Sequence, residues 1–304
     1  MQRVREQLRV PSQKEVDGSG ITVGVLDTGI GQHPDLADRL LRFQDFVGHR
    51  ALMYDDNGHG THVCGILCGS GAASQGKYVG IAPGVRLVVG KVLDDKGDGS
   101  TESMLMGLDW ILRIREQCRI RILNISVGIG TLEEAKKERQ LKAMIEEAWD
   151  RGILVVCAAG NKGPEPGTIS AVGGSTKAVT VGCHDGRYEL DSPGRCETYS
   201  GRGVEGAVFR KPDLVAPGTD IVSCNVHYYR LHGKFRNAYM AKSGTSMATP
   251  IVSGAAALAM EKFPWMTNEE CKQKLQYTAT DLHLPWNQQG WGMVNVGRLL
   301  RNDF

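Results

Sequence analysis

The first half of the chain alternates short apolar runs with longer segments of helical spacing. Each run is apolar at almost every position, which is typical of a strand buried on both faces of a sheet. The runs cover residues 21–26, 85–93, 121–127, 153–158 and 178–182. Helices are predicted over 101–118 and 132–151, where apolar side chains recur at helical spacing. This alternation predicts an α/β fold with a mostly parallel sheet covered by helices on both faces.

Another helix is predicted over residues 251–260, which are small or apolar nearly all round. Such a segment is typical of a helix inside the core. Pro250 is tolerated there only in the first turn, where its missing N–H leaves no hydrogen bond unmade. Ser246 would then lie at the N-terminal end, where free N–H groups and the helix dipole favour negative charge. Taken alone, this serine is better explained as a helix cap than as a nucleophile.

The remaining segments are less regular. Residues 183–242 are rich in Gly, Pro and polar groups, with hairpin-like pieces around Tyr228 and Phe235, and a last helix is predicted over 268–277. We find no internal repeat, linker or low-complexity segment. Residues 1–17 are predicted to be a charged N-terminal arm with a short helix that Pro11 would end.

Four polar residues fall where predicted elements begin or end: Asp27, His59, Asn161 and Ser246. A serine hydroxyl is nucleophilic only if a base takes its proton, and neutral histidine does this near neutral pH. A buried carboxylate fixes the imidazole tautomer. A side-chain amide and a backbone N–H at a helix start can stabilise an oxyanion. Spacing alone does not bring these residues together, because they are scattered along the chain.

Two patterns suggest metal sites, and neither is favoured. His59 and His62 are three residues apart, but the Glu of a His-Glu-x-x-His zinc site is absent. The run from Asp94 to Gly99 resembles the start of a calcium loop, yet Leu105 stands where an EF-hand requires Glu.

Composition restricts the class of protein. The chain has 304 residues and a formal net charge of +2, which gives no reason to expect nucleic acid or an acidic membrane as a partner. No apolar run is long enough to span a bilayer. The start has no apolar region of the signal-peptide type, and the eight cysteines include no Cys-x-x-Cys pair. These features predict reduced, mostly structural thiols in a cytoplasmic protein.

Three blocks resemble the signature motifs of the subtilisin-like serine proteases, the peptidase S8 family. They are Asp27-Thr28-Gly29, Asn57-Gly58-His59-Gly60-Thr61-His62-Val63 and Ser243-Gly244-Thr245-Ser246-Met247-Ala248-Thr249-Pro250. Their order along the chain, Asp then His then Ser, is the subtilisin order. The resemblance runs from about residue 18 to residue 300, and within the family it is greatest to the bacterial intracellular, AprX-like branch.

The resemblance implies a three-layer subtilisin-like fold and a serine endopeptidase that forms an acyl-enzyme intermediate on peptides or unfolded proteins. Residues 18–304 would form the peptidase domain. Asp27 would orient His59, His59 would act as general base and acid, and Ser246 would be the nucleophile. Asn161 matches the residue whose amide supplies the oxyanion hole. His62 is the second histidine of its motif and is not expected to be catalytic.

Two segments resemble those between which an extended peptide substrate is held by main-chain hydrogen bonds. They are Gly97-Asp98-Gly99 and Ser126-Val127-Gly128. The second of them, together with Ala158-Ala159-Gly160, would form the walls of the primary specificity pocket. Asp94, Asp95 and Asp98 give one rim a negative character that would favour basic side chains, although solvated loop charges explain them as well.

The family implies no cofactor for the chemistry, but many members carry structural calcium. Residues 69–80, after the helix that begins at His59, hold no carboxylate, so the common calcium site cannot be located from the sequence, and a calcium site elsewhere on the surface stays an open alternative. An inhibitory role for residues 1–17 is a further hypothesis. Two other classes of protein compete. An aspartic protease would need a second Asp-Thr-Gly or Asp-Ser-Gly, which the chain lacks. A catalytically silent binding protein would normally have lost a member of the triad.

Overall fold

The computed structural model describes residues 1–127, 135–186 and 195–302. A seven-stranded sheet lies at its centre, in the order β2-β3-β1-β4-β5-β6-β7, and every neighbouring pair is parallel. The strands are β1 (Thr22–Asp27), β2 (Leu40–Asp45), β3 (Arg86–Lys91), β4 (Ile120–Ile125), β5 (Leu154–Ala158), β6 (Val179–Cys183) and β7 (Leu214–Ala216). The predicted α/β class is confirmed, because each fully apolar run of the sequence forms a strand buried on both faces.

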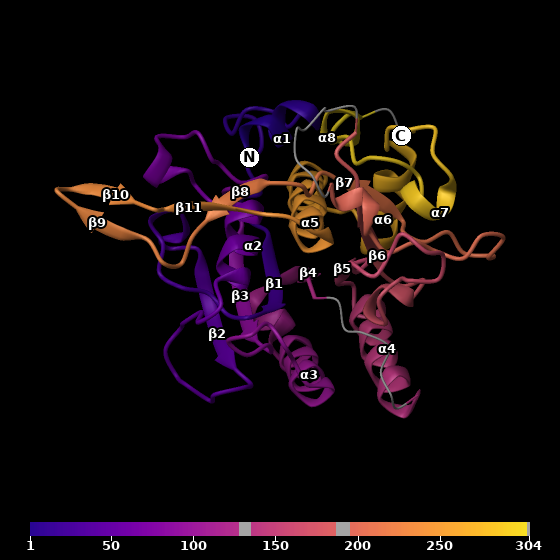
Figure 1. Cartoon of the computed structure of the whole chain (residues 1–304), viewed down its shortest axis with the longest axis horizontal. Helices are drawn as coiled ribbons and strands as arrows, with labels where there is room; N and C mark the ends of the chain where they lie inside the picture. Colours follow the sequence, from indigo (N-terminus) through magenta and orange to yellow (C-terminus); the bar gives the residue numbers. More distant parts are fainter. Residues whose placement is uncertain (128–134, 187–194, 303–304) are drawn as a thin grey trace.

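Helices cover both faces of this sheet, which gives three layers (Figure 1). The helices α2 (His59–Cys68) and α5 (Thr245–Lys262) pack on the face that receives Val23 and Val25 of β1. The opposite face is covered by α3 (Thr101–Cys118) and α4 (Ala135–Asp150). Side chains alternate between the two faces of a strand, so β1 contributes Leu26 to this second core.

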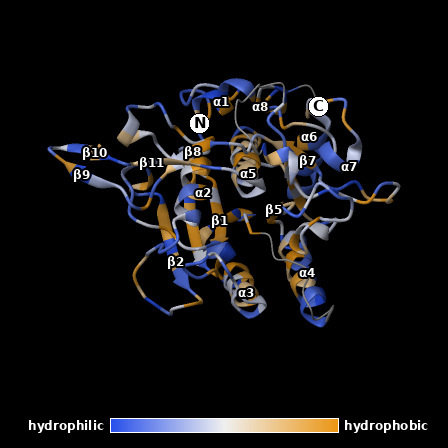
Figure 2. Ribbon diagram, viewed as in Figure 1, coloured by the Kyte–Doolittle hydropathy of each residue, from blue (hydrophilic) through white to orange (hydrophobic). Residues whose placement is uncertain are grey.

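Helix α5 lies in the core, and Figure 2 shows it as a largely apolar ribbon. Its residues from Met247 to Met260 are all buried. The sequence placed Pro250 in the first turn, and this was wrong: the helix begins at Thr245, so Pro250 lies in its second turn. Since proline has no N–H, the carbonyl of Ser246 receives no helical hydrogen bond at this point.

Strand β2 was not predicted. It lies at the edge of the sheet, and most of its side chains are partly or fully exposed. Because its outer side is exposed to solvent, β2 lacks the continuous apolar run that identifies the inner strands. The predicted last helix is α6 (Asn268–Tyr277), which begins with a capping box formed by Thr267 and Glu270.

The N-terminal segment is packed against the rest of the chain. Helix α1 (Gln2–Gln7) is followed by Leu8, and the side chains of Met1, Val4 and Leu8 are buried. The Arg5 guanidinium donates to the carbonyls of Gly80 and Ile81. Figure 1 shows α1 beside α8 (Val296–Leu299), and the N–H of Val296 donates to the Leu8 carbonyl.

A long hairpin projects from the body of the molecule beside β2 (Figure 1). Its base is the antiparallel pair β8 (Ile221–Cys224) and β11 (Tyr239–Lys242), and its outer part is β9 (Tyr229–Leu231) with β10 (Lys234–Arg236). The remaining elements are α7 (Trp286–Gln289) and the short 3-10 turns η1 (Pro34–Leu36), η2 (Ala72–Ser74), η3 (Val172–Gly174) and η4 (Cys196–Thr198).

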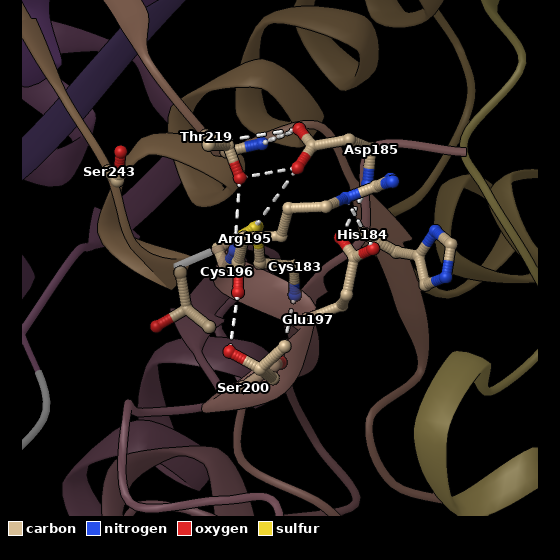
Figure 3. The surroundings of a disulfide bond; sticks show 12 residues. Cys183, His184, Asp185, Arg195, Cys196, Glu197, Ser200, Thr219 and Ser243 are labelled. Carbon is tan, nitrogen blue, oxygen red and sulfur yellow. Dashed lines mark hydrogen bonds and ion pairs between the residues drawn. A yellow bond between two sulfur atoms is a disulfide. The ribbon is translucent and has the colours of Figure 1, made fainter. Parts of the chain in front are cut away.

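The cysteines correct one prediction. Cys183, at the end of β6, forms a disulfide with Cys196, at the start of η4 (Figure 3). The expectation of reduced thiols throughout was therefore wrong for this pair, because spacing along the chain does not reveal which cysteines meet in space. The other six are free and buried. Among the described residues, no helix combines the length and apolar character that a bilayer crossing requires.

Candidate active site

The carboxyl end of β1 and the first residue of α2 bring Asp27 and His59 together. His59 Nδ1 lies 2.6 Å from Asp27 Oδ1, which also accepts the N–H of Thr28 at 2.7 Å. The Asp27 side chain is fully buried, whereas that of His59 is 22% exposed. Burial alone would lower the pKa of His59, but the charge of Asp27 and its hydrogen bond outweigh burial and raise it above 6.5.

A third residue, Asp55, holds the two segments in register. Its Oδ1 accepts the Thr28 hydroxyl at 2.8 Å and the Gly58 N–H at 2.7 Å, and its Oδ2 accepts both the N–H and the hydroxyl of Thr61. These donors lower the pKa of Asp55 although burial acts in the opposite direction. No role for Asp55 was predicted from the sequence. The only sequence signal was an aspartate three residues before a glycine, in the loop that leads to His59.

Asn161 lies beside the start of α5. Its Oδ1 accepts the N–H and the hydroxyl of Thr245, both at 3.1 Å. This fixes the amide so that its Nδ2 group is left for a ligand. Gly244, the residue before the helix, has φ 142°, a conformation that other residues rarely adopt, and a Cβ there would make a tight contact of 3.3 Å with Asn161 Nδ2.

Ser246 is the second residue of α5 and is partly exposed. Helices α2 and α5 pack against each other, so His59 and Ser246 lie at the N-terminal ends of adjacent helices. Within the described parts of the chain, no hydrogen bond joins the Ser246 hydroxyl to His59. Such bonds are often long in an unliganded enzyme and tighten when substrate binds.

The second histidine of the motif, His62, lies in the interior of the protein. His62 is buried, and its Nε2 lies 3.1 Å from the Met240 carbonyl of β11. Burial lowers its pKa to about 3, so the ring is neutral at physiological pH. This environment agrees with the expectation that His62 takes no part in the chemistry.

The structure describes all of one predicted wall of the substrate pocket, residues 158–160, and part of the other, residues 126–128. Ala158 accepts the Ser170 hydroxyl at 2.7 Å, Ala159 accepts the Ser170 N–H at 2.8 Å, and Gly160 accepts the N–H of Gly201 at 2.7 Å. This segment is therefore held by Ser170 and Gly201 through all three of its carbonyls. On the other wall, Ser126 accepts the Asn124 amide at 2.8 Å and is buried. Val127 is partly exposed, and Gly128 lies outside the described residues.

The segment 97–99 forms part of a tight loop. Asp94 engages both main-chain groups of Asp98, donating its N–H to the Asp98 carbonyl and accepting the Asp98 N–H on Oδ1. Asp94 Oδ1 also accepts the N–H of Lys96. Gly97 has φ 84°, and Gly99 is exposed. Because Asp94 binds amides of its own loop, its carboxylate acts as a turn cap rather than as a calcium ligand.

Two groups of potential metal ligands occur among the described residues. They are His33, Asp35 and Cys224, and Cys183, Asp185 and Cys196. The second group does not fit a metal ion, because its two sulfur atoms are bonded to each other. Asp185 in addition accepts the N–H and the hydroxyl of Thr219 (Figure 3).

The first group lies beside the segment 69–80, where many subtilisin-like proteases hold calcium. Asp35 accepts the N–H of Gly71 at 3.1 Å, the N–H of Ala73 at 2.9 Å and the Tyr239 hydroxyl at 2.8 Å. Its oxygens thus face three hydrogens, and no other carboxylate is present in the segment. The residues in place do not fit a calcium ion here.

Two contacts therefore stand at the helix starts: Asp27 with His59 at the start of α2, and Asn161 with Thr245 at the start of α5, whose second residue is Ser246. The chain matches the subtilase family over residues 18–292. It belongs to the subtilase family and is a subtilisin-like serine protease.

Relatives of known activity cover most of the chain. It is 39% identical to serine protease AprX of Bacillus subtilis over 94% of the chain and 67% of that protein. It is 35% identical to subtilisin Savinase of Lederbergia lenta, over 96% of the chain and 95% of the relative. Among solved structures, sphericase aligns with a TM-score of 0.78 at 28% identity, covering 92% of this chain and 93% of its own.

Proposed function

We propose that the chain is an endopeptidase in which Ser246 attacks the scissile carbonyl while His59 takes the serine proton. The carrying observation is the 2.6 Å contact between His59 Nδ1 and Asp27 Oδ1. It holds the ring with Nδ1–H toward the carboxylate and leaves Nε2 as the basic atom. Asp27 stabilises the imidazolium that forms, and His59 then protonates the leaving amine. Water hydrolyses the resulting acyl-enzyme by the same steps in reverse.

The oxyanion of each tetrahedral intermediate would be bound by Asn161 and by the backbone N–H of Ser246. The Asn161 amide is already oriented by Thr245, so little reorganisation is needed as charge develops. Replacing Asn161 by Ala would lower kcat by about 10²–10³-fold, the magnitude found for the equivalent asparagine of subtilisin, a member of the same family.

A fluorophosphonate probe tests this proposal directly, because it reacts only with an activated serine. Wild-type protein should be labelled at Ser246, as mapped by peptide mass spectrometry. Ser246→Ala should not be labelled, and His59→Ala should be labelled far more slowly. Absence of labelling of folded wild-type protein would remove the hydrolase proposal. It would favour the alternative, a catalytically silent binding protein with a subtilase fold.

The substrates would be peptides or unfolded proteins bound in extended form against residues 97–99 and 126–128. We propose that no cofactor takes part in the chemistry, and that the segment 69–80 is held by Asp35 without calcium. The absence of a nucleic-acid partner stays a prediction from the sequence. A cytoplasmic location also stays a prediction. The Cys183–Cys196 disulfide removes one argument for it, the expected reduced thiols, because stable disulfides are rare in that compartment.

A further inference from the structure

The outer part of the projecting hairpin is strongly basic. Between Asp220 and Glu261 the chain contains no carboxylate side chain. The hairpin carries five basic side chains, all exposed: His227, Arg230, His232, Lys234 and Arg236. None of them takes part in an ion pair with a described residue; Arg230 lies over the ring of Phe235 at 5.4 Å. The three permanent cations Arg230, Lys234 and Arg236 therefore make the hairpin a concentration of positive charge that no described residue neutralises by an ion pair.

The base of the hairpin is held firmly against the body of the molecule. His33 Nε2 lies 2.8 Å from the Ala238 carbonyl, and the His33 ring meets Tyr228 edge-on with ring centres 5.1 Å apart. Tyr228 packs in turn on Phe235, with ring centres 5.9 Å apart. On the opposite strand, Asn225 donates its side-chain amide to the Asn237 carbonyl. These contacts give the basic segment a fixed position rather than a free one.

The base of the hairpin lies next to Gly58, the residue before His59. The side chain of Val226 occupies the space that a Cβ on Gly58 would need, 2.9 Å away, and it does the same at Gly31. Gly58 is the residue immediately before His59 at the start of α2. On its other strand, the hairpin continues through β11, whose Met240 carbonyl contacts His62, into the segment that carries Ser246.

The chemistry of peptide hydrolysis indicates which half of the substrate lies near the hairpin. In the proposed mechanism His59 protonates the leaving amine, so the substrate segment that follows the scissile bond must pass His59. The acyl half is held on the opposite side, by Asn161 and residues 158–160. The hairpin, attached beside His59, is thus on the side of the leaving segment.

We propose that the β9–β10 hairpin is an accessory binding surface for an acidic, extended segment of protein substrates, C-terminal to the scissile bond. The proposal rests on the proposed endopeptidase function. At about 3.3 Å per residue, a hairpin arm that reaches roughly 15 Å can run alongside about four to five residues of extended substrate. In the described structure β9 and β10 pair only with each other, so an extended segment can add to an outer edge while its carboxylates meet the cations.

Charge reversal tests the surface without relying on catalysis. A fluorescein-labelled decapeptide rich in Asp and Glu is titrated with Ser246→Ala protein, and binding is followed by fluorescence anisotropy. Adding Lys234→Glu and Arg236→Glu should weaken binding by about 10-fold, and raising the salt concentration should weaken the parent complex similarly. The matched control, Lys136→Glu with Arg139→Glu, reverses two exposed cations on α4, far from the hairpin in Figure 1, and should leave binding unchanged.

Kinetics then separate this proposal from the proposed function. Two peptides share all residues up to the scissile bond, and the segment after it is acidic in one and replaced by Gln and Asn in the other. The wild type should cleave the acidic peptide with about 5- to 20-fold higher kcat/KM, and the hairpin variant should not. A short substrate that ends at a chromogenic leaving group should be cleaved equally by both proteins, which shows that the variant is folded.

Each contrary result has a defined meaning. Failure of every protein to cleave the short substrate would overturn the proposed function, while peptide binding by the Ser246→Ala protein would still decide the hairpin's role. Equal affinity of parent and hairpin variant, or an equal loss in the α4 control, would overturn the hairpin proposal. Tighter hairpin-dependent binding of a single-stranded oligonucleotide than of the acidic peptide would overturn it as well.

Discussion

The Thr28 hydroxyl donates to Asp55 Oδ1 at 2.8 Å, which ties the strand end carrying Asp27 to the loop that leads into His59. The Thr28 hydroxyl oxygen also accepts the N–H of Gly60 at 2.8 Å, so Thr28 is hydrogen-bonded both to the loop before His59 and to the first turn of α2. The Asp27–His59 contact is thereby fixed from outside by a buried carboxylate that would touch neither substrate nor nucleophile. We regard Asp55 as a positioning residue.

Replacing Asp55 should impair both stability and catalysis. Asp55→Ala leaves several buried donors without a partner, and we expect a loss of about 3–5 kcal/mol in the free energy of unfolding. If the fold survives, kcat should fall about 10- to 100-fold with little change in KM, because a small displacement of the catalytic groups is costly. Urea unfolding and steady-state kinetics measure these effects.

An exposed aspartate serves as the control for Asp55. Asp38→Asn changes an exposed carboxylate in the loop after η1 and should leave both quantities as in the wild type. If Asp55→Ala lost stability but kept full kcat, Asp55 would be structural only. Asp55→Asn, which keeps the shape and one acceptor, should recover part of the activity.

The activity should depend on pH through His59. Asp27 favours the charged imidazole, so the pKa of His59 lies above 6.5. The base must be neutral to act, and activity is therefore lost as pH falls through this raised pKa. In a pH profile of kcat/KM, the midpoint of the acid limb should lie above 6.5. Asp27→Asn should move the midpoint down, because burial then acts unopposed, and should lower kcat about 10⁴-fold, the order known for subtilisin. A midpoint that does not move would contradict the proposed pairing.

His62 should make the fold less stable in mild acid. Its pKa is about 3 in the folded protein and about 6.5 when unfolded, so below pH 6.5 only the unfolded chain gains the proton. Stability from this residue is present above 6.5 and declines as pH falls. Between pH 6.5 and 5 the loss should be roughly 1.5 kcal/mol. His62→Gln should remove this part of the pH dependence in urea unfolding, whereas exposed His227→Gln should not.

The disulfide should stabilise the segment around Gly218, which is hydrogen-bonded to Gly244 just before the start of α5. A Cβ on Gly218 would lie 2.5 Å from Cys183 Sγ, and the Gly218 carbonyl accepts the Gly244 N–H at 2.9 Å, just before the start of α5. Reduction, or replacement of Cys183 and Cys196 by Ala, should lower the free energy of unfolding by about 2–4 kcal/mol. Unfolding with and without reductant measures this effect.

A thiol count provides an independent check of the disulfide. Alkylation of the denatured, unreduced protein should modify six cysteines, and all eight after reduction. Eight modified thiols without reductant would show that the pair is not bonded. Cys118→Ala should keep the response to reductant, since Cys118 is free.

The segment 69–80 should be indifferent to calcium. Asp35 already binds two amides of this segment and the Tyr239 hydroxyl. Asp35→Ala should therefore lower the free energy of unfolding by about 3 kcal/mol. A calcium chelator should leave the Tm of the wild type unchanged, and exposed Asp38→Ala should have no comparable effect. A chelator-induced fall in Tm that Asp35→Ala abolishes would show a bound cation.

The inner strands and the core helices could be predicted from the sequence because burial on all sides leaves a local signature. The candidate site residues could be proposed from the sequence for a different reason: Asp27, His59 and Ser246 each lie within a distinctive sequence motif. Contacts between distant residues leave no such signature. The Asn161–Thr245 bond joins residues 84 apart, and the Cys183–Cys196 pair is separated by a stretch with no pairing signal.

The role of Asp55 and the position of the hairpin could not be predicted from the sequence, although hairpin-like pieces around Tyr228 and Phe235 were expected. An aspartate in a glycine-rich loop is ordinary in composition, and only the three-dimensional structure shows that its oxygens meet donors from both sides of the site. The basic residues of the hairpin are visible in the sequence. Their relation to His59 depends on Val226 packing against Gly58, which no pattern along the chain predicts.

The burial of α5 has a consequence for the time at which a newly made chain becomes active. A ribosome releases Asp27 and His59 long before Ser246, and α5 must then pack beside α2 on the sheet before the serine can face the histidine. A growing chain therefore carries the acid and the base without the nucleophile. If the proposed function holds, proteolytic activity begins only after α5 has been made and has packed into the core, and a chain that has not reached α5 cannot cut its neighbours.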